Sequence, residues 1–205
     1  MLNLNLNPKT DVLPFVAATA GEFAALFYWL RLLEGGQPWL AAVVLWVGFS
    51  VERIAVALWI LFVYTPKDAS APARPPLWQS ALTLVAITVS EVLIWVIWLA
   101  LARSSGHLVA GAVLMALMLA EHSVEMSLIK RTPPFAWVTN RSTIFFTVME
   151  VAGGMGWLYL TWNGQPLAGA AVLLAGLSVE HVLQGSQLKP EVVVRPAPAP
   201  ERQPA

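Results

Sequence analysis

Six apolar stretches, each long enough to cross a lipid bilayer, constrain this 205-residue chain more than any other feature. A hydrocarbon core about 30 Å thick needs about 20 consecutive, mostly apolar residues in a helix. The stretches that meet this requirement lie near residues 12–33, 38–64, 77–102, 107–129, 142–162 and 165–187. Only 12% of the residues are charged, whereas about a quarter are charged in soluble domains. The sequence therefore predicts an all-α integral membrane protein with six transmembrane helices in contact with the lipid bilayer.

The chain divides into a bundle and a tail. Residues 1–188 are expected to form one six-helix domain, because a chain of this length suits a single domain. Residues 189–205 are rich in proline and predict a disordered cytoplasmic tail. An A-x-A pattern ending at Ala20 would suit signal peptidase, but Asp11 and Pro14 interrupt the apolar run before it. We therefore expect the first helix to be retained.

Lysine and arginine are distributed unevenly between the two ends of the predicted helices. Nine lie on the side of both termini: Lys9, Lys67, Arg74, Lys130, Arg131, Arg141, Lys189, Arg195 and Arg202. Two lie on the opposite side, Arg31 and Arg103. Because basic residues accumulate in cytoplasmic segments, the N- and C-termini are predicted to face the cytoplasm.

One pattern occurs three times in the chain, at shifts of 69 and 128 residues. The three copies cover about residues 12–64, 77–129 and 142–187, and each contains two apolar stretches. Residues shared by all copies include Thr19, Thr88 and Thr147; Trp29, Trp98 and Trp157; and Leu45, Leu114 and Leu173. Each copy predicts a helical hairpin, and three parallel hairpins imply pseudo-threefold symmetry about the membrane normal. The repeated tryptophans are expected to anchor the helices at the membrane interface or to pack between them.

Two glutamates recur in every copy, 30 residues apart, with the turn midway between them. At 1.5 Å per residue both lie about 20 Å from the turn, and so at the same depth. The six predicted members of this layer are Glu22, Glu52, Glu91, Glu121, Glu150 and Glu180. A charged carboxylate at the centre of a transmembrane helix costs ~2.5–3.5 kcal/mol. The glutamates are therefore expected to face the interior of the bundle and to bind protons or cations.

Other polar residues accompany the glutamates at equivalent positions. The residues directly after the second-helix glutamates are Arg53, His122 and His181. The residues three positions before the first-helix glutamates, on the same helix face, are Thr19, Thr88 and Thr147. One turn after Glu121 and Glu180 lie Glu125 and Gln184. We expect the threonines to donate hydrogen bonds to the carboxylates, and Arg53 to balance charge by pairing with Glu52.

Three functional interpretations follow from this pattern. The first is a small cation or proton transport or channel unit that uses the buried glutamate layer. The second is a cofactor-binding subunit, in which His122 and His181 are candidate ligands for a metal or a haem. The third is a structural subunit of a larger complex with a membrane-protein partner. The net charge of zero offers no electrostatic basis for binding nucleic acid.

The motifs of common enzymes are missing from the sequence. There is no H-E-x-x-H, no glycine-rich phosphate loop and no G-x-S-x-G, and the chain contains no cysteine. A di-iron site of the bundle type needs Glu-x-x-His on one helix face, whereas glutamate and histidine are adjacent here. The last apolar stretch contains no lysine that could form a Schiff base with retinal. The sequence thus identifies no catalytic residue and no cofactor.

Overall fold

The computed structural model describes residues 12–63, 77–130 and 132–188, and its regular structure there is entirely α-helical. The helices are α1 (Val12–Glu34), α2 (Pro38–Val63), α3 (Leu77–Ser104), α4 (His107–Lys130), α5 (Arg141–Trp162) and α6 (Pro166–Leu188). All six are long and apolar enough to cross a membrane. The predicted all-α fold is confirmed, and every helix end lies within two residues of its expected position. The predicted disordered tail, 189–205, lies outside the described residues.

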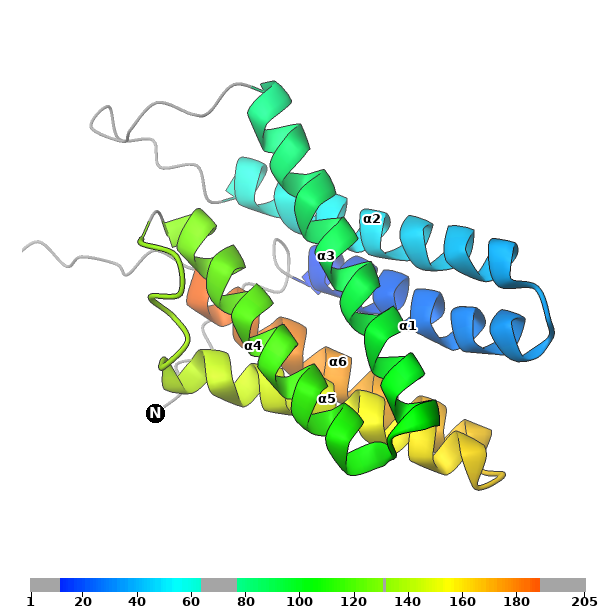
Figure 1. Cartoon of the computed structure of the whole chain (residues 1–205). Helices are drawn as coiled ribbons and strands as arrows, with labels where there is room; N and C mark the ends of the chain where they lie inside the picture. Colours follow the sequence, from blue (N-terminus) through cyan, green and yellow to red (C-terminus); the bar gives the residue numbers. More distant parts are fainter. Residues whose placement is uncertain (1–11, 64–76, 131, 189–205) are drawn as a thin grey trace, which may run out of the picture.

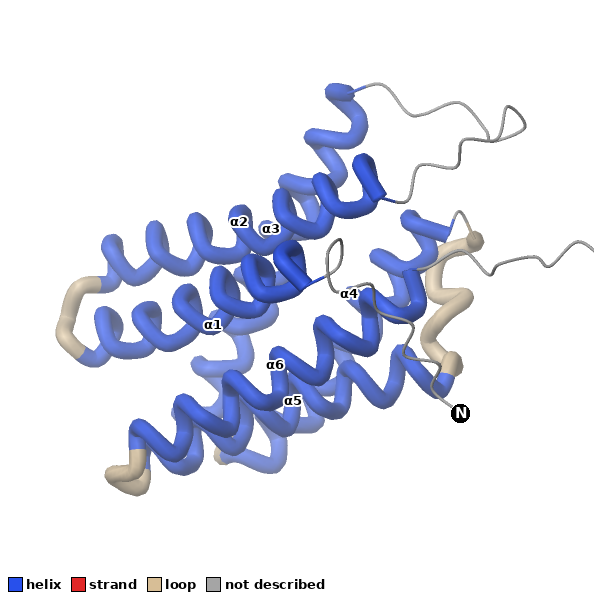
Figure 2. The backbone as a smooth tube through the Cα atoms, turned by 180° about the vertical axis from the view of Figure 1, so that it is seen from behind, coloured by secondary structure: helices blue, strands red, loops and turns tan. Residues whose placement is uncertain are grey.

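The helices form three antiparallel hairpins, α1–α2, α3–α4 and α5–α6. Figures 1 and 2 show the three short turns at one end of the bundle, so α1, α3 and α5 run in the same direction. Contacts between α2 and α3, α4 and α5, and α6 and α1 join consecutive hairpins and return the last to the first. The six helices therefore enclose a common interior.

Each hairpin turn contains a glycine in the left-handed region. Gly36, Gly106 and Gly164 have φ angles of 72°, 85° and 77°. A residue with a Cβ atom rarely adopts this conformation, which ends one helix and redirects the chain. Pro38 and Pro166 then occupy the first position of α2 and α6, where a missing N–H has no cost.

Glycine also decides how closely the two helices of a hairpin approach. A Cβ atom on Gly48 would lie 2.9 Å from the carbonyl oxygen of Gly21, and one on Gly176 would lie 2.7 Å from that of Met149. In the second hairpin the position equivalent to Gly48 and Gly176 is occupied by Leu117. Figures 1 and 2 show α3 and α4 diverging away from their turn, whereas α1–α2 and α5–α6 stay side by side.

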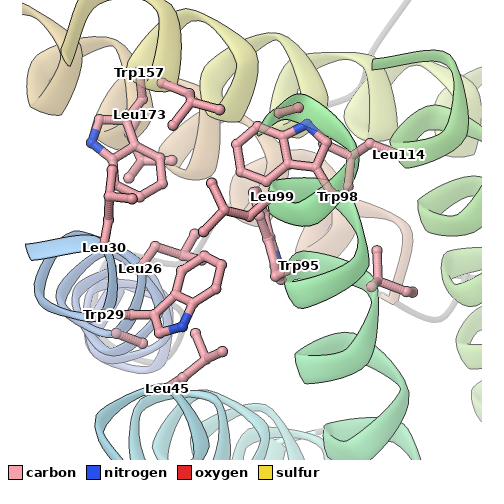
Figure 3. Packing of buried hydrophobic residues seen from close by; sticks show 14 of the residues in the cluster. Leu26, Trp29, Leu30, Leu45, Trp95, Trp98, Leu99, Leu114, Trp157 and Leu173 are labelled. Atoms are coloured by element: carbon pink, nitrogen blue, oxygen red, sulfur yellow. The ribbon is translucent and has the colours of Figure 1, made fainter. Parts of the chain in front are cut away.

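The recurring tryptophans and leucines form an apolar core between the hairpin turns and the glutamates. Trp29, Trp98 and Trp157 are at most 3% exposed, and they pack with leucines from several helices (Figure 3). Of the two roles expected for these tryptophans, the structure therefore shows packing. On the other side of the glutamates, Phe15 and Phe146 belong to a second, smaller apolar cluster.

Candidate functional site: a buried carboxylate cluster

The six predicted glutamates are buried, with 2% to 9% of their surface exposed. Their predicted polar neighbours are buried as well: Arg53, His122, His181, Thr19, Thr88, Thr147, Glu125 and Gln184. We refer to seven glutamates as the carboxylate cluster: Glu22, Glu52, Glu91, Glu121, Glu125, Glu150 and Glu180. All six helices contribute to it, because each contains at least one of these residues.

The guanidinium of Arg53 extends from α2 into the second hairpin. Its Nη2 donates to Oε2 of Glu91 at 2.6 Å and to Oε1 of Glu121 at 3.1 Å, while Nη1 donates to Oε1 of Glu125 at 2.7 Å. Nε also donates to Oε2 of Glu91, at 3.1 Å. The expected partner, Glu52, is farther away, with 3.6 Å between Nη1 and Oε1. The predicted pairing with Glu52 is therefore present as an ion pair, and the side chain is also long enough to make shorter contacts with the carboxylates of the next hairpin.

His122 extends from α4 toward α5. Its Nδ1 lies 2.8 Å from Oγ1 of Thr147, whose hydroxyl donates to the carbonyl oxygen of Thr143. Because the hydroxyl has only one proton, its oxygen must accept from Nδ1–H. The other ring nitrogen, Nε2, lies 3.3 Å from Oε2 of Glu150 and 3.8 Å from Oε2 of Glu121.

His181 extends from α6 toward α1, as His122 extends from α4 toward α5. Its Nδ1 lies 2.9 Å from the carbonyl oxygen of Leu177 and 2.9 Å from Oε2 of Glu180. The carbonyl oxygen can only accept a hydrogen bond, so Nδ1 carries a proton. Nε2 then faces Oε1 of Glu52 at 3.7 Å and Oε2 of Glu22 at 3.8 Å.

The threonines differ from their expected role. Oγ1 of Thr19 lies 3.3 Å from Nδ1 of His181, and Oγ1 of Thr147 contacts His122. These two hydroxyls therefore meet the histidines of the preceding hairpin rather than the glutamates of their own helix. Gln184, by contrast, reaches the cluster directly, because its Nε2 donates to Oε2 of Glu125 at 2.8 Å.

The three residues that follow the second-helix glutamates make equivalent contacts. Arg53 reaches Glu91 of the second hairpin, His122 reaches Glu150 of the third, and His181 reaches Glu22 of the first. Each junction between hairpins thus contains a nitrogen side chain and the first-helix glutamate of the next hairpin. The repeat pattern predicts these residues but not the direction of their contacts.

Several carboxylate oxygens have no hydrogen-bond partner among the described residues. They are Oε1 of Glu22, Oε2 of Glu52, Oε2 of Glu121 and Oε2 of Glu150. A buried acceptor without a donor is costly, particularly on a charged group. The unpartnered oxygens therefore mark the part of the cluster that could accept a proton or coordinate a cation.

Two groups of three residues have the geometry to share one ion. Glu22, Glu91 and Glu150, the equivalent first-helix glutamates, bring ligand oxygens within 4.8 Å of one another. Glu22, Glu180 and His181 form the second group, with the same limit on separation. His122, the other candidate ligand, is in neither group. A haem between the two histidines is not favoured, because carboxylate oxygens lie beside Nε2 of both rings, where the haem iron would bind.

No protein-family model matches this sequence, and no curated protein and no solved structure shows significant similarity to it. Its function is therefore inferred from the carboxylate cluster itself.

Proposed function

We propose that this chain is a multi-pass membrane protein that serves as a small cation transport unit, with a metal ion or a proton bound in the carboxylate cluster. The outer surface supports the membrane location. Leu108 and Leu167 are 89% and 82% exposed, and Trp39 and Trp78 are also largely exposed at opposite ends of the helices. Aromatic residues at both ends and leucines facing outward are typical of helices in lipid.

The contacts between hairpins support a pseudo-threefold arrangement about the membrane normal. Equivalent residues join each hairpin to the next, and α6 returns to α1. Glu22, Glu91 and Glu150 would then lie around the symmetry axis, where their oxygens come within 4.8 Å of one another. With nine basic residues beside the termini and two beside the turns, the termini would face the cytoplasm.

The charge of the cluster is the observation that carries the proposal. Seven buried carboxylates are accompanied by one guanidinium and two imidazoles among the described residues. Even if both imidazoles were protonated, four negative charges would remain without compensation. Unpaired charge in a low-dielectric interior is strongly unfavourable, so the cluster must take up protons or cations.

The histidine geometry points to the same requirement. Nε2 of His122 and Nε2 of His181 face carboxylate oxygens, although each ring already has a proton on Nδ1. In a neutral ring with its proton on Nδ1, Nε2 carries a lone pair, which would repel those oxygens. At His122, where Nε2 lies 3.3 Å from Glu150, a proton on Nε2 would convert this repulsion into a hydrogen bond. At His181, where the separations are 3.7 Å and 3.8 Å, a proton or a metal ion between nitrogen and oxygen would convert it into attraction.

Apolar residues lie on both sides of the cluster. The tryptophan and leucine core lies toward the turns, and a smaller group from α1, α4, α5 and α6, which contains Phe15 and Phe146, lies toward the other end. These layers would limit the access of water to an ion bound in the cluster. Transport would then require each layer to open in turn, as in carriers with a site near the bilayer midplane.

Flux through reconstituted protein tests this proposal. The purified chain in phosphatidylcholine–phosphatidylglycerol liposomes is tested for proton entry with pyranine and for Mn²⁺ entry with calcein. We expect flux of at least one cation above that of empty liposomes, and its loss in Glu22→Gln. Glu34→Gln is the matched control on α1, because Glu34 is exposed and lies outside the cluster. Flux equal to that of empty liposomes contradicts transport, and unchanged flux in Glu22→Gln contradicts the site.

A structural role is the second candidate, because every junction between hairpins contains buried polar contacts. Those contacts would hold the three hairpins together in a complex with other membrane proteins. Such a role predicts no flux, and it predicts that cluster variants lose stability without any change in cation binding.

A further inference from the structure

We propose that Glu22, Glu180 and His181 form a site for a divalent ion of the first transition row, such as Mn²⁺, Fe²⁺, Co²⁺ or Zn²⁺. The inference rests on the proposed cation binding and specifies its ligands and its chemical class. The three residues bring potential ligand atoms within 4.8 Å of one another. They come from α1 and α6, so the site joins the first hairpin to the third.

The orientation of His181 is the first argument for a metal. Nδ1 bonds to the carbonyl oxygen of Leu177 and to Glu180, which fixes the ring and leaves Nε2 as the nitrogen available to a ligand. Metal-binding histidines commonly donate their other N–H to a carbonyl or a carboxylate. Nε2 does face carboxylates, with Glu52 at 3.7 Å and Glu22 at 3.8 Å.

These nitrogen–oxygen distances are too long for hydrogen bonds, but they are close to the distance between two adjacent ligand atoms that bind the same metal ion. A metal about 2.0–2.2 Å from each of its nitrogen and oxygen ligands places adjacent ligand atoms about 3.3 Å apart. A shift of about half an ångström in the Glu22 side chain would close the difference. Glu180, whose Oε2 lies beside Nδ1, would have to turn its carboxylate toward Nε2 to become a ligand, which would leave the carbonyl oxygen of Leu177 to hold Nδ1–H. Oε1 of Glu22 is buried and has no hydrogen-bond partner among the described residues, so no hydrogen bond of this oxygen would be lost when a metal binds.

The position of Arg53 favours this group over the three glutamates on the proposed axis. Arg53 donates twice to Oε2 of Glu91, a member of that second group. Its fixed positive charge beside Glu91 would repel a divalent ion there. Glu22 and Glu180 are not among the carboxylates that accept hydrogen bonds from Arg53, although Nη1 of Arg53 lies 3.6 Å from Oε1 of the neighbouring Glu52. An imidazole nitrogen among the ligands selects transition ions over Ca²⁺ and Mg²⁺.

The repeat supplies a matched control. Glu121 and His122 occupy the positions equivalent to Glu180 and His181, but His122 belongs to neither group of ligands. His107, the third histidine, lies at the start of α4 beside the turn. Substitution of each histidine by glutamine therefore separates binding at the proposed site from binding by any imidazole in the chain.

The experiment measures Zn²⁺ and Co²⁺ binding to the full-length chain, purified in detergent with a tag that contains no histidine. Competition with a chromogenic chelator should give one Zn²⁺ per chain, and Co²⁺ should give a visible absorption band. His181→Gln and Glu22→Gln should weaken binding about tenfold or more, whereas His122→Gln and His107→Gln should not. Far-UV circular dichroism and gel filtration check that each variant is folded.

A measurement on the unaltered chain covers the case in which a variant does not fold. Pulsed EPR of bound Mn²⁺ should detect a nitrogen coupling that changes when histidine is labelled with ¹⁵N. No saturable binding of any transition ion, binding of Ca²⁺ alone, no histidine coupling, or equal losses in His122→Gln and His181→Gln would each overturn the assignment. Proton flux in chelator-treated liposomes would show that the proposed transport persists without this metal site.

Discussion

Nη2 of Arg53 and Oε2 of Glu91 are 2.6 Å apart, and this contact joins the first hairpin to the second. The corresponding nitrogens of the other two hairpins belong to histidines, whose shorter side chains leave longer separations to the next glutamate. At the junction closed by Arg53, Nε and Nη2 both donate to Glu91, whereas the first-helix glutamates of the other two junctions, Glu150 and Glu22, each have an unpartnered oxygen. Of these two junctions, the one between the third hairpin and the first contains the group of potential ligands Glu22, Glu180 and His181, and the metal site is proposed there.

Removal of the guanidinium tests the first junction. Arg53→Ala should lower the free energy of unfolding by ~3–5 kcal/mol, because it leaves buried carboxylates without their partner. Glu91→Gln in the Arg53→Ala background should recover part of this loss, since it removes one of those charges. Thermal unfolding of the single and double variants in detergent gives the coupling energy.

Glu52→Gln is the control for that cycle, since Glu52 is the adjacent carboxylate at the longer distance of 3.6 Å. Its coupling to Arg53 should be smaller than that of Glu91. A larger coupling energy with Glu52 than with Glu91 would show that Arg53 pairs mainly within its own hairpin, and would contradict the contact between the first and second hairpins.

The close approach of α1 and α2 should depend on Gly48. Gly48→Ala places a methyl group against the backbone of Gly21, so it should destabilise the protein by ~1–3 kcal/mol. Gly111→Ala is the matched control, because the new methyl group would meet only the flexible side chain of Met155. Equal unfolding temperatures for the two variants would show that the α1–α2 contact is looser than described.

The buried and exposed tryptophans should differ in their effect on stability. Trp98→Ala removes a fully buried ring from the core and should cost ~3–5 kcal/mol. Trp39→Ala removes a ring that is 86% exposed and should change the stability in detergent by less than ~1 kcal/mol. A similar loss of stability in both variants would contradict the packing role assigned to the repeated tryptophans.

The proposed orientation can be tested by cysteine labelling, since the natural chain contains no cysteine. Single variants Thr10→Cys and Pro200→Cys should be protected from an impermeant maleimide in intact cells. Gln37→Cys, in the first hairpin turn, should react from outside. Rapid labelling at position 10 or 200 in intact cells would show that the termini face outward, opposite to the proposed orientation.

Sequence periodicity predicted the helices and the residues of the cluster more fully than it predicted their contacts. The length of apolar runs determines which segments can cross a bilayer, and the spacing of Glu22 and Glu52 about their turn determines that they share a depth. The shorter contacts of Arg53 with the second hairpin could not be predicted, because they depend on how the first two hairpins are rotated relative to each other. The divergence of α3 from α4 also went unpredicted, although Leu117 in place of a glycine was its signal in the sequence.

Cation transport requires the carboxylate cluster, including Glu22, Glu91 and Glu150, to lie in the interior of the bundle and to hold bound protons or cations. A high-resolution density map of the chain in a lipid nanodisc measures this most directly. We predict that the three carboxylates face one another, with either non-protein density within about 2.0–2.6 Å of Glu22 or short carboxyl–carboxyl hydrogen bonds that require a shared proton. A map in which any of the three faces lipid, or in which each is separately paired with a protein donor and no ion is present, would contradict cation binding by this cluster.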